Sequence, residues 1–257
     1  MNGIISSIHF SPIKSLSFTN IESCEIKKNL GILNDRKFAF SRVVDAEKAL
    51  LIEKNPNERK LNNFLSLKNS PVLNKYNFTY KDNKLALILD GKEQVSIIAD
   101  DLDQRSKLIN KLIDLESSLK KPIFLLKNNE FPFYDTSNSN KVFNSISLIN
   151  LNSIKDLEKK INQKIELQRF RGNFYIEGLE AWEERKWIGK IIKINNISFK
   201  IEKNIPRCSA VNLKPKTDIR DKSLLKLLKK NYDHFDMGVY LRSLDEGKIE
   251  AGNILEC

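Results

Sequence analysis

Alternation between hydrophobic and polar positions dominates the first hundred residues and predicts β-strands there. Residues 3–18 form a β-branched run interrupted by Pro12, and residues 21–28 and 37–44 are strand-like segments on either side of a turn. Residues 76–98 contain two hairpin signals, Asp82-Asn83 and Asp90-Gly91, each between apolar segments.

Helical spacing of apolar residues appears in three places. Residues 100–121 begin with aspartates suited to an N-cap and end before Pro122, after which residues 122–128 are strand-like. A second helix is predicted at 152–164, with Asn152 or Ser153 as its cap, and a third, short and amphipathic, at 221–232. The remaining apolar segments predict strands at residues 165–178, 187–203, 208–215, 237–244 and 247–256.

Strands therefore predominate, broken by helices that do not alternate with them regularly, and no repeat period is present. This order argues against a doubly wound nucleotide-binding sheet and favours a mainly β or α+β fold containing a β-barrel. We place a division near residue 120, which gives a β-rich domain at 1–120 and a second domain at 121–257. The Asn-rich segment 126–143 is predicted to be a surface loop at a pocket mouth.

Net charge is +11, from 44 Lys plus Arg against 33 Asp plus Glu. Most of the excess is lysine spread along the chain, which favours a solvated surface over a nucleic-acid interface. Apolar stretches are too short to cross a membrane, and the N-terminal residues lack the pattern of a signal peptide. We expect a cytoplasmic protein with no membrane and no nucleic-acid partner.

Three cysteines, no CxxC motif and two histidines argue against a disulfide framework, a typical iron–sulfur cluster and a histidine-rich zinc site. Any redox chemistry would then use one cysteine and a bound cofactor, with electrons from outside. Cys208 follows Pro206 and Arg207, and a neighbouring cation favours the thiolate. From these residues alone it is a packed hydrophobe, a nucleophile, a ligand for molybdenum, zinc or copper, or a persulfide carrier.

Other groups suited to an anion lie elsewhere in the chain. Arg169 and Arg171 stand at strand-like i, i+2 spacing, so both would face one way and hold either an anion or surface carboxylates. Lys14 and Ser15 follow a strand, and Arg36 stands at the entry of another. We interpret His234 as structural or exposed, and Glu183 and Glu184 as surface charges.

Five blocks in this order resemble the MOSC family (molybdenum cofactor sulfurase C-terminal domain) with its β-rich N-terminal companion, and most closely the amidoxime-reducing proteins. The blocks cover nearly the whole chain, although each alone is degenerate. They are "FSPIKSL", "GILNDRKFAF", "RFRGNFYIEGLEAWEERKWIG", "PRCSAVNLKPKT" and "MGVYLRSLDEGKIEAGN". The resemblance implies a MOSC-type β-barrel with a few peripheral helices.

It also implies a molybdenum–pterin cofactor (molybdopterin) whose metal is bound by a cysteine, and the matching residue is Cys208, as metal ligand and catalytic centre. Basic and polar groups would hold the pterin and its phosphate. By motif match these are Lys14, Ser15, Arg36, Arg171 and Asn173, with Arg207 beside the cysteine and Asn144 and Ser145 in a loosely matching segment.

Four departures from the family pattern stand out. Gly172 replaces the proline of the "RPN" motif, which would loosen the backbone, and Asn253 replaces a late aspartate. Lys54 stands near the usual arginine of a substrate-linked segment, which puts substrate preference in doubt. No ferredoxin-like cysteines follow the last block, so we expect a separate donor, similar to cytochrome b5 or ferredoxin.

The leading hypothesis is a molybdenum-dependent oxidoreductase that removes oxygen from a small N-hydroxylated substrate, with electrons from an external redox protein. The alternative is a carrier of persulfide sulfur or of molybdenum cofactor, without reductase turnover. The sequence gives little support to pyridoxal phosphate, because Lys14 would have to serve as the Schiff base. A nucleic-acid binder rests on charge alone and ranks last.

Overall fold

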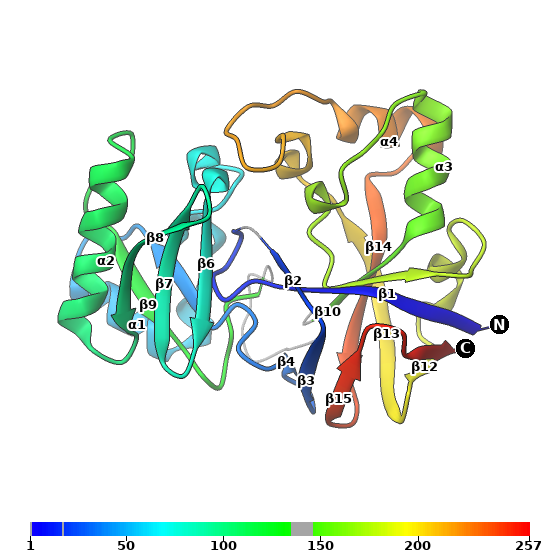
Figure 1. The fold of residues 1–257 in the computed structure, drawn as a ribbon, viewed down its shortest axis with the longest axis horizontal. Helices are drawn as coiled ribbons and strands as arrows, with labels where there is room; N and C mark the ends of the chain where they lie inside the picture. The colour runs from blue at the N-terminus through cyan, green and yellow to red at the C-terminus, as the bar shows by residue number, and fades with distance from the viewer. Residues whose placement is uncertain (1, 17, 135–145) are drawn as a thin grey trace.

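The computed structural model describes residues 2–16, 18–134 and 146–257. Two bodies lie side by side (Figure 1), one a β-barrel with helices on its outside and the other a smaller sheet-and-helix unit. We call the first the barrel lobe, mainly residues 2–10 and 146–257, and the second the hairpin lobe, mainly residues 37–127.

Seven strands form the closed barrel. They are β1 (Asn2–Phe10), β10 (Ile146–Asn150), β11 (Phe174–Glu177), β12 (Ile191–Ile194), β13 (Ile197–Pro206), β14 (Asp236–Ser243) and β16 (Ile254–Glu256). The strand order around the barrel is β11, β10, β14, β13, β12, β16, β1. Strand β1 pairs with β11 and closes the barrel. Strand β2 (Thr19–Ile21) pairs with β1 and extends the sheet beyond the barrel. Closure pairs the first and last strands, which removes the exposed edges of an open sheet.

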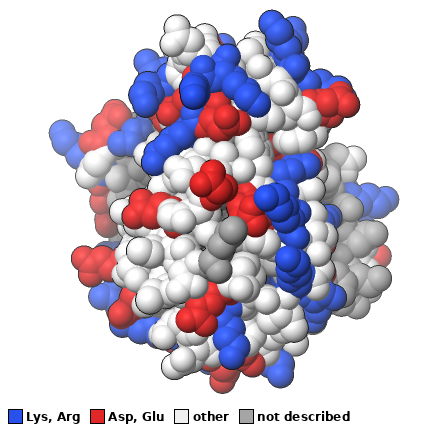
Figure 2. Space-filling view, turned by 90° about the vertical axis from the view of Figure 1, so that its right-hand side faces the viewer, with Lys and Arg blue, Asp and Glu red and all other residues white. Residues whose placement is uncertain are grey.

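Side chains that alternate along the strands fill the barrel. On β1, Ile5 and Ile8 are buried inside, whereas Ile4 is exposed. The outer face of β10, β11 and β14 is covered by helices α3 (Leu151–Ile161) and α4 (Leu224–Tyr232), whose buried Leu157 and Leu228 belong to one apolar cluster. On the face shown in Figure 2, basic and acidic side chains are interspersed.

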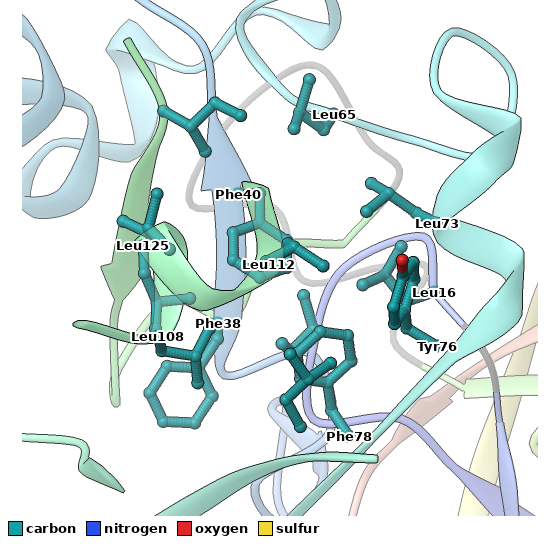
Figure 3. Packing of buried hydrophobic residues seen from close by; sticks show 14 of the residues in the cluster. Leu16, Phe38, Phe40, Leu65, Leu73, Tyr76, Phe78, Leu108, Leu112 and Leu125 are labelled. Atoms are coloured by element: carbon teal, nitrogen blue, oxygen red, sulfur yellow. The ribbon is translucent and has the colours of Figure 1, made fainter. Parts of the chain in front are cut away.

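The hairpin lobe is built around the three-stranded sheet β6-β7-β8. Its aromatic and leucine core joins this sheet to the β5–β9 pair and to the buried face of α2 (Figure 3). The elements are α1 (Ala46–Lys54), α2 (Leu102–Leu115), β5 (Phe38–Ser41), β6 (Tyr76–Lys81), β7 (Lys84–Leu89), β8 (Lys92–Ile98) and β9 (Phe124–Lys127).

A small sheet and six 3-10 turns complete the described chain. The sheet consists of β3 (Ser23–Lys27), β4 (Gly31–Ile32) and β15 (Gly247–Glu250). The turns are η1 (Pro56–Glu58), η2 (Leu61–Asn63), η3 (Pro71–Lys75), η4 (Leu167–Arg169), η5 (Glu183–Trp187) and η6 (Ser209–Asn212). Because β1 pairs within the barrel and β9 pairs with β5, pairings cross residue 120, and the predicted division there stays a prediction.

The predicted fold class, a mainly β protein with a barrel and peripheral helices, is confirmed. Both hairpin turns occur where expected, and α2 begins after its cap Asp101. Other expectations were wrong. Helix α3 is capped by Asn150, helix α1 was not predicted, and residues 208–215, expected as a strand, contain the turn η6.

Candidate functional site

Lys14 and Ser15 lie in the turn that follows β1, docked on the start of β5. The Lys14 backbone N–H donates to the carbonyl of Phe38 over 2.8 Å. The Lys14 side chain is buried, and its Nζ donates to the carbonyls of Tyr134 (2.8 Å) and Phe133 (3.4 Å). Ser15 is buried beside it, so this turn brings a charge and a hydroxyl into the seam between the lobes.

Arg36 lies in the turn between β4 and β5, close to the first one. Its backbone N–H donates to the carbonyl of Ser11 over 2.7 Å, and its carbonyl accepts from the N–H of Phe133. Its guanidinium forms an ion pair with Asp35, which is fully buried and also accepts from the Ser11 N–H over 3.0 Å. Burial raises the pKa of Asp35, and the Arg36 charge opposes that shift. The sequence reasoning missed Asp35, although the adjacent aspartate of the "DR" motif was a signal.

Asn173 joins these turns to the barrel. Its Oδ1 accepts from the N–H and Oγ of Ser147 and from Arg36 Nη1, at 3.1, 2.9 and 3.3 Å. Its Nδ2 donates to the carbonyl of His9 and to Asp35 Oδ2, both at 3.1 Å. Both amide hydrogens of a fully buried side chain are therefore engaged, which indicates that Asn173 positions Arg36 and Asp35.

Arg171 and Arg36 approach the same aromatic ring from different parts of the chain. The Arg36 guanidinium carbon lies 4.9 Å from the centroid of Phe18, and that of Arg171 lies 5.4 Å from it. Cations over an aromatic face are attracted by the ring. Phe18, which the sequence reasoning did not single out, thus holds together two of the predicted cofactor-binding arginines.

Three of the predicted site residues also have an unusual backbone conformation. Ser15, Arg36 and Arg171 have φ angles of 60°, 52° and 51°, in the left-handed region that L-residues rarely adopt. Most of the other described non-glycine residues with positive φ are Asn or Asp, which tolerate this region. Strained backbone at non-Asx residues concentrates at functional sites. Three predicted site residues share this feature.

Cys208 stands at the start of η6 with an exposed side chain. Arg207 before it is held by carbonyls, with Nη1 donating to Phe170 over 2.7 Å and Nε to Met237 over 2.9 Å. Burial, together with the charge of Arg171, lowers the pKa of Arg207. Arg207 therefore ties the cysteine to the residue before Arg171, which indicates a positioning role.

The expectation of a strand at Arg169 was wrong. Arg169 lies in η4, and its buried guanidinium lies between Glu166 (2.6 Å) and Asp221 (2.7 Å), so it holds carboxylates, which the sequence had left open beside an anion. The Gly172 N–H donates to Tyr175 Oη over 3.1 Å, and a Cβ at this position would lie 2.7 Å from Ile149 Cδ1, so that a larger residue would require the Ile149 side chain to shift. The looser backbone expected from Gly172 stays a prediction.

Other residues singled out in the sequence lie away from these turns or outside the described residues. Glu183 and Glu184 are both buried, in contrast to the predicted surface charges; Glu183 pairs with Lys186, and Glu184 accepts from Ser153 Oγ over 2.9 Å. Burial raises the pKa of Glu184. His234 packs against the rings of Trp182 and Tyr232, as the structural interpretation expected. Asn144 and Ser145 lie outside the described residues.

The segment of sequence that contains Cys208 is rich in basic residues. Residues 203–230 contain nine Lys or Arg and two Asp, a net +7 within a chain of net +11. Helix α4, in this segment, packs against η6, the turn that begins at Cys208. No helix within the described ranges is long and apolar enough to span a membrane.

Comparison with known proteins confirms the resemblance for the second half of the chain. The MOSC domain model matches residues 135–256, just under half of the sequence. Molybdenum cofactor sulfurase of Caenorhabditis elegans is 32% identical over 113 residues, which cover 42% of this chain and 15% of that protein. Mitochondrial amidoxime reducing component 2 of Rattus norvegicus is 32% identical over 77 residues, 30% of this chain and 22% of that protein.

Two solved structures that match this chain have low sequence identity to it. The YUAD protein from Bacillus subtilis has 9% identity and a TM-score of 0.45, with 100% of this chain and 95% of that chain covered. YiiM from Geobacillus stearothermophilus has 21% identity and a TM-score of 0.35, with 44% and 53% covered.

Proposed function

We propose that this protein, whose residues 135–256 match the MOSC domain, is a molybdenum-cofactor-dependent oxidoreductase that reduces small N-hydroxylated compounds. The single observation that carries the proposal is the convergence of the motif residues. Lys14 and Arg36 both contact Tyr134, and Arg36 and Arg171 both approach the ring of Phe18. Arg207, next to the exposed Cys208, donates to the carbonyl of the residue before Arg171.

The chemistry of these side chains fits a molybdenum–pterin group. A dianionic phosphate requires cationic and hydroxyl donors at fixed positions, and Lys14, Arg36 and Ser15 provide them on buried turns. An exposed thiol is a soft ligand for molybdenum, and Cys208 provides one. Arg171 would contribute a further guanidinium to the pterin.

When bound, the cofactor would supply two-electron redox chemistry and accept the oxygen removed from the substrate. The protein would bind and orient it. Asp35 and Asn173 hold the Arg36 guanidinium in one direction, and Arg207 fixes the turn that presents Cys208. We assign no general base, because His234 packs among rings and donates nothing to the site.

Electrons would come from a separate redox protein, similar to cytochrome b5 or to ferredoxin. The net charge of +7 within residues 203–230 supports an acidic donor, because complementary charge accelerates association. The similarity to an amidoxime reducing component supports an N-hydroxylated substrate.

Elemental analysis of freshly purified protein, paired with pterin fluorescence after oxidation, tests the proposal. We expect molybdenum near stoichiometry and turnover of an amidoxime with a chemical or protein electron donor. Cys208→Ala should remove turnover while the protein stays folded, whereas Cys257→Ala, a change at another exposed cysteine, should not. A fully active Cys208→Ala variant, or preparations without molybdenum and pterin, would contradict the proposal.

The alternative, a carrier of persulfide sulfur, is supported by the exposed thiol of Cys208 and by the similarity to molybdenum cofactor sulfurase. It predicts an additional sulfur atom on Cys208, visible by mass spectrometry and removed by reductant. It also predicts no turnover of N-hydroxylated substrates by protein that contains molybdenum and pterin.

A further inference from the structure

A cavity of about 400 Å³ lies between the two lobes, beside the candidate site. The hairpin lobe contributes Leu67, Asn74 and Asn77 to its wall, and the barrel lobe contributes Arg171 and Ala210. This volume is in the range of pockets that bind small organic molecules. Cys208 does not line it, so the cavity is a compartment next to the predicted metal ligand.

The wall formed by residues 213–217 is held in place from both sides. Asn74, itself buried, donates through Nδ2 to the carbonyls of Lys214 (2.9 Å) and Thr217 (2.7 Å). Arg169 Nη1 donates to the carbonyl of Leu213 over 3.0 Å. A wall fixed by hydrogen bonds from two lobes is pre-formed, which reduces the cost of ordering it around a ligand.

Lys216, on this wall, has a φ of 61°. It is the fourth residue near the site, after Ser15, Arg36 and Arg171, that is neither Gly, Asn nor Asp and has left-handed backbone. That conformation costs about 1–2 kcal/mol for an L-residue and persists only where the surrounding structure imposes it. The hydrogen bonds that hold residues 213–217 therefore fix the backbone conformation of Lys216 at the edge of the cavity.

Positive charge outweighs negative charge in the wall of the cavity. The carboxylate of Glu166 in the wall is engaged by Arg169, which also binds Asp221, while Asp218 of the neighbouring loop pairs with Lys75 at 3.9 Å. The remaining charged groups of the wall are the cations of Arg171, Lys214 and Lys216. Apolar surface comes from Phe18, Leu67, Ala210, Leu213 and Pro215.

We propose that this interlobe cavity is a binding site for a small organic anion with a flat apolar body, such as an aromatic carboxylate. The apolar surfaces would cover the body, and Lys214 and Lys216 would attract the anionic group. The site does not depend on the reductase proposal, because it requires no cofactor and no turnover.

Three probes of nearly identical shape test the inference, namely benzoate, benzamide and benzamidine, which carry negative, zero and positive charge. Isothermal titration with the full chain should give benzoate an affinity at least about fivefold higher than benzamide, with benzamidine weakest. The preference should diminish with added salt. Equal affinities, a preference for benzamidine, or no benzoate binding at millimolar concentration would overturn the proposal.

Substitutions of the two lysines in the cavity wall test whether the anion binds there. Lys214→Gln/Lys216→Gln should lower benzoate affinity by roughly two- to fivefold and leave benzamide affinity unchanged. Lys226→Gln/Lys230→Gln, which neutralises the same number of charges on α4 away from the cavity wall, should leave both affinities unchanged. An equal loss of benzoate affinity in both variants would show a general charge effect and overturn the site.

Discussion

Ser15 shows how local strain and function coincide in this protein. Its φ of 60° is unfavourable for a serine, yet the residue is buried in the turn that also holds Lys14. A glycine would adopt this conformation without steric cost. The presence of serine is explained if its hydroxyl is used by the phosphate of a cofactor.

Two substitutions at residue 15 distinguish the contribution of the hydroxyl to cofactor binding from the effect of backbone strain on stability. Ser15→Gly and Ser15→Ala both remove the hydroxyl, but only glycine relieves the left-handed backbone. We expect Ser15→Gly to be more stable than Ser15→Ala by about 1 kcal/mol in urea unfolding, and both to retain less molybdenum than the unchanged protein. An alanine variant as stable as the glycine variant would show that the turn carries no strain.

Gly172 lies close to a packed side chain, since a Cβ there would lie 2.7 Å from Ile149 Cδ1 and would force that side chain to shift. We expect Gly172→Ala to destabilise the protein by about 1–3 kcal/mol, as overpacking does. Ile149→Val removes that methyl group, so the double variant should lose less than the two single changes together. Denaturant unfolding of all three variants measures the coupling, and strict additivity would contradict the collision.

The elements differ in how far the sequence predicts them. Hairpin β6–β7–β8 and helix α2 are predictable because Asp82-Asn83, Asp90-Gly91 and the Asp101 cap are local signals. Helix α1 lacks a periodic apolar face: Ala49 and Ile52 are buried, while Leu50 is half exposed. Only its N-cap, Asp45, was readable in the sequence.

The segment that contains turn η6 was predicted as a strand, but its apolar residues belong to two different cores. Ala210 and Leu213 pack into the core of the hairpin lobe, whereas Val211 packs in the cluster of α3 and α4. Only the tertiary structure shows that the segment connects two cores. Similarly, Arg169 could not be separated from Arg171 without knowing that Asp221, 52 residues later, lies beside it.

Asn74 couples the hairpin lobe to the loop 213–217 through two hydrogen bonds from one amide. We expect Asn74→Ala to cost about 1 kcal/mol, because it removes two hydrogen bonds of a buried amide, although the Lys214 carbonyl keeps the Thr217 N–H and hydroxyl as donors. Backbone amides of residues 213–220 should then exchange hydrogen faster. Asn77→Ala, at a cavity residue on β6, is the control and should leave that exchange unchanged. Equal exchange in the two variants would contradict the coupling.

Across the whole molecule, the candidate site lies where the two lobes meet. Motif matching identified Lys14, Arg36, Arg171 and Cys208 by residue type and order. It could not identify Phe18, because the ring gains its role only when turns distant in sequence approach it. The backbone carbonyls that hold Lys14 and Arg207 have no side-chain signature at all.

The uneven charge of the chain leads to a prediction about electron transfer. Segment 203–230 carries most of the net positive charge, and α4 presents exposed Lys226 and Lys230 next to the turn of Cys208. If an acidic redox protein delivers the electrons, its association should be accelerated by this charge and slowed by salt.

We expect Lys226→Glu/Lys230→Glu to reduce the second-order rate of reduction by an acidic donor roughly three- to tenfold at low ionic strength. Turnover at saturating donor should remain unchanged, because neither lysine belongs to the proposed cofactor site. Lys84→Glu/Lys92→Glu, at exposed positions of the hairpin lobe, reverses the same amount of charge and serves as the control in stopped-flow measurements. If both double variants slow reduction equally, the donor responds to net charge alone, and the surface around Cys208 is not where it docks.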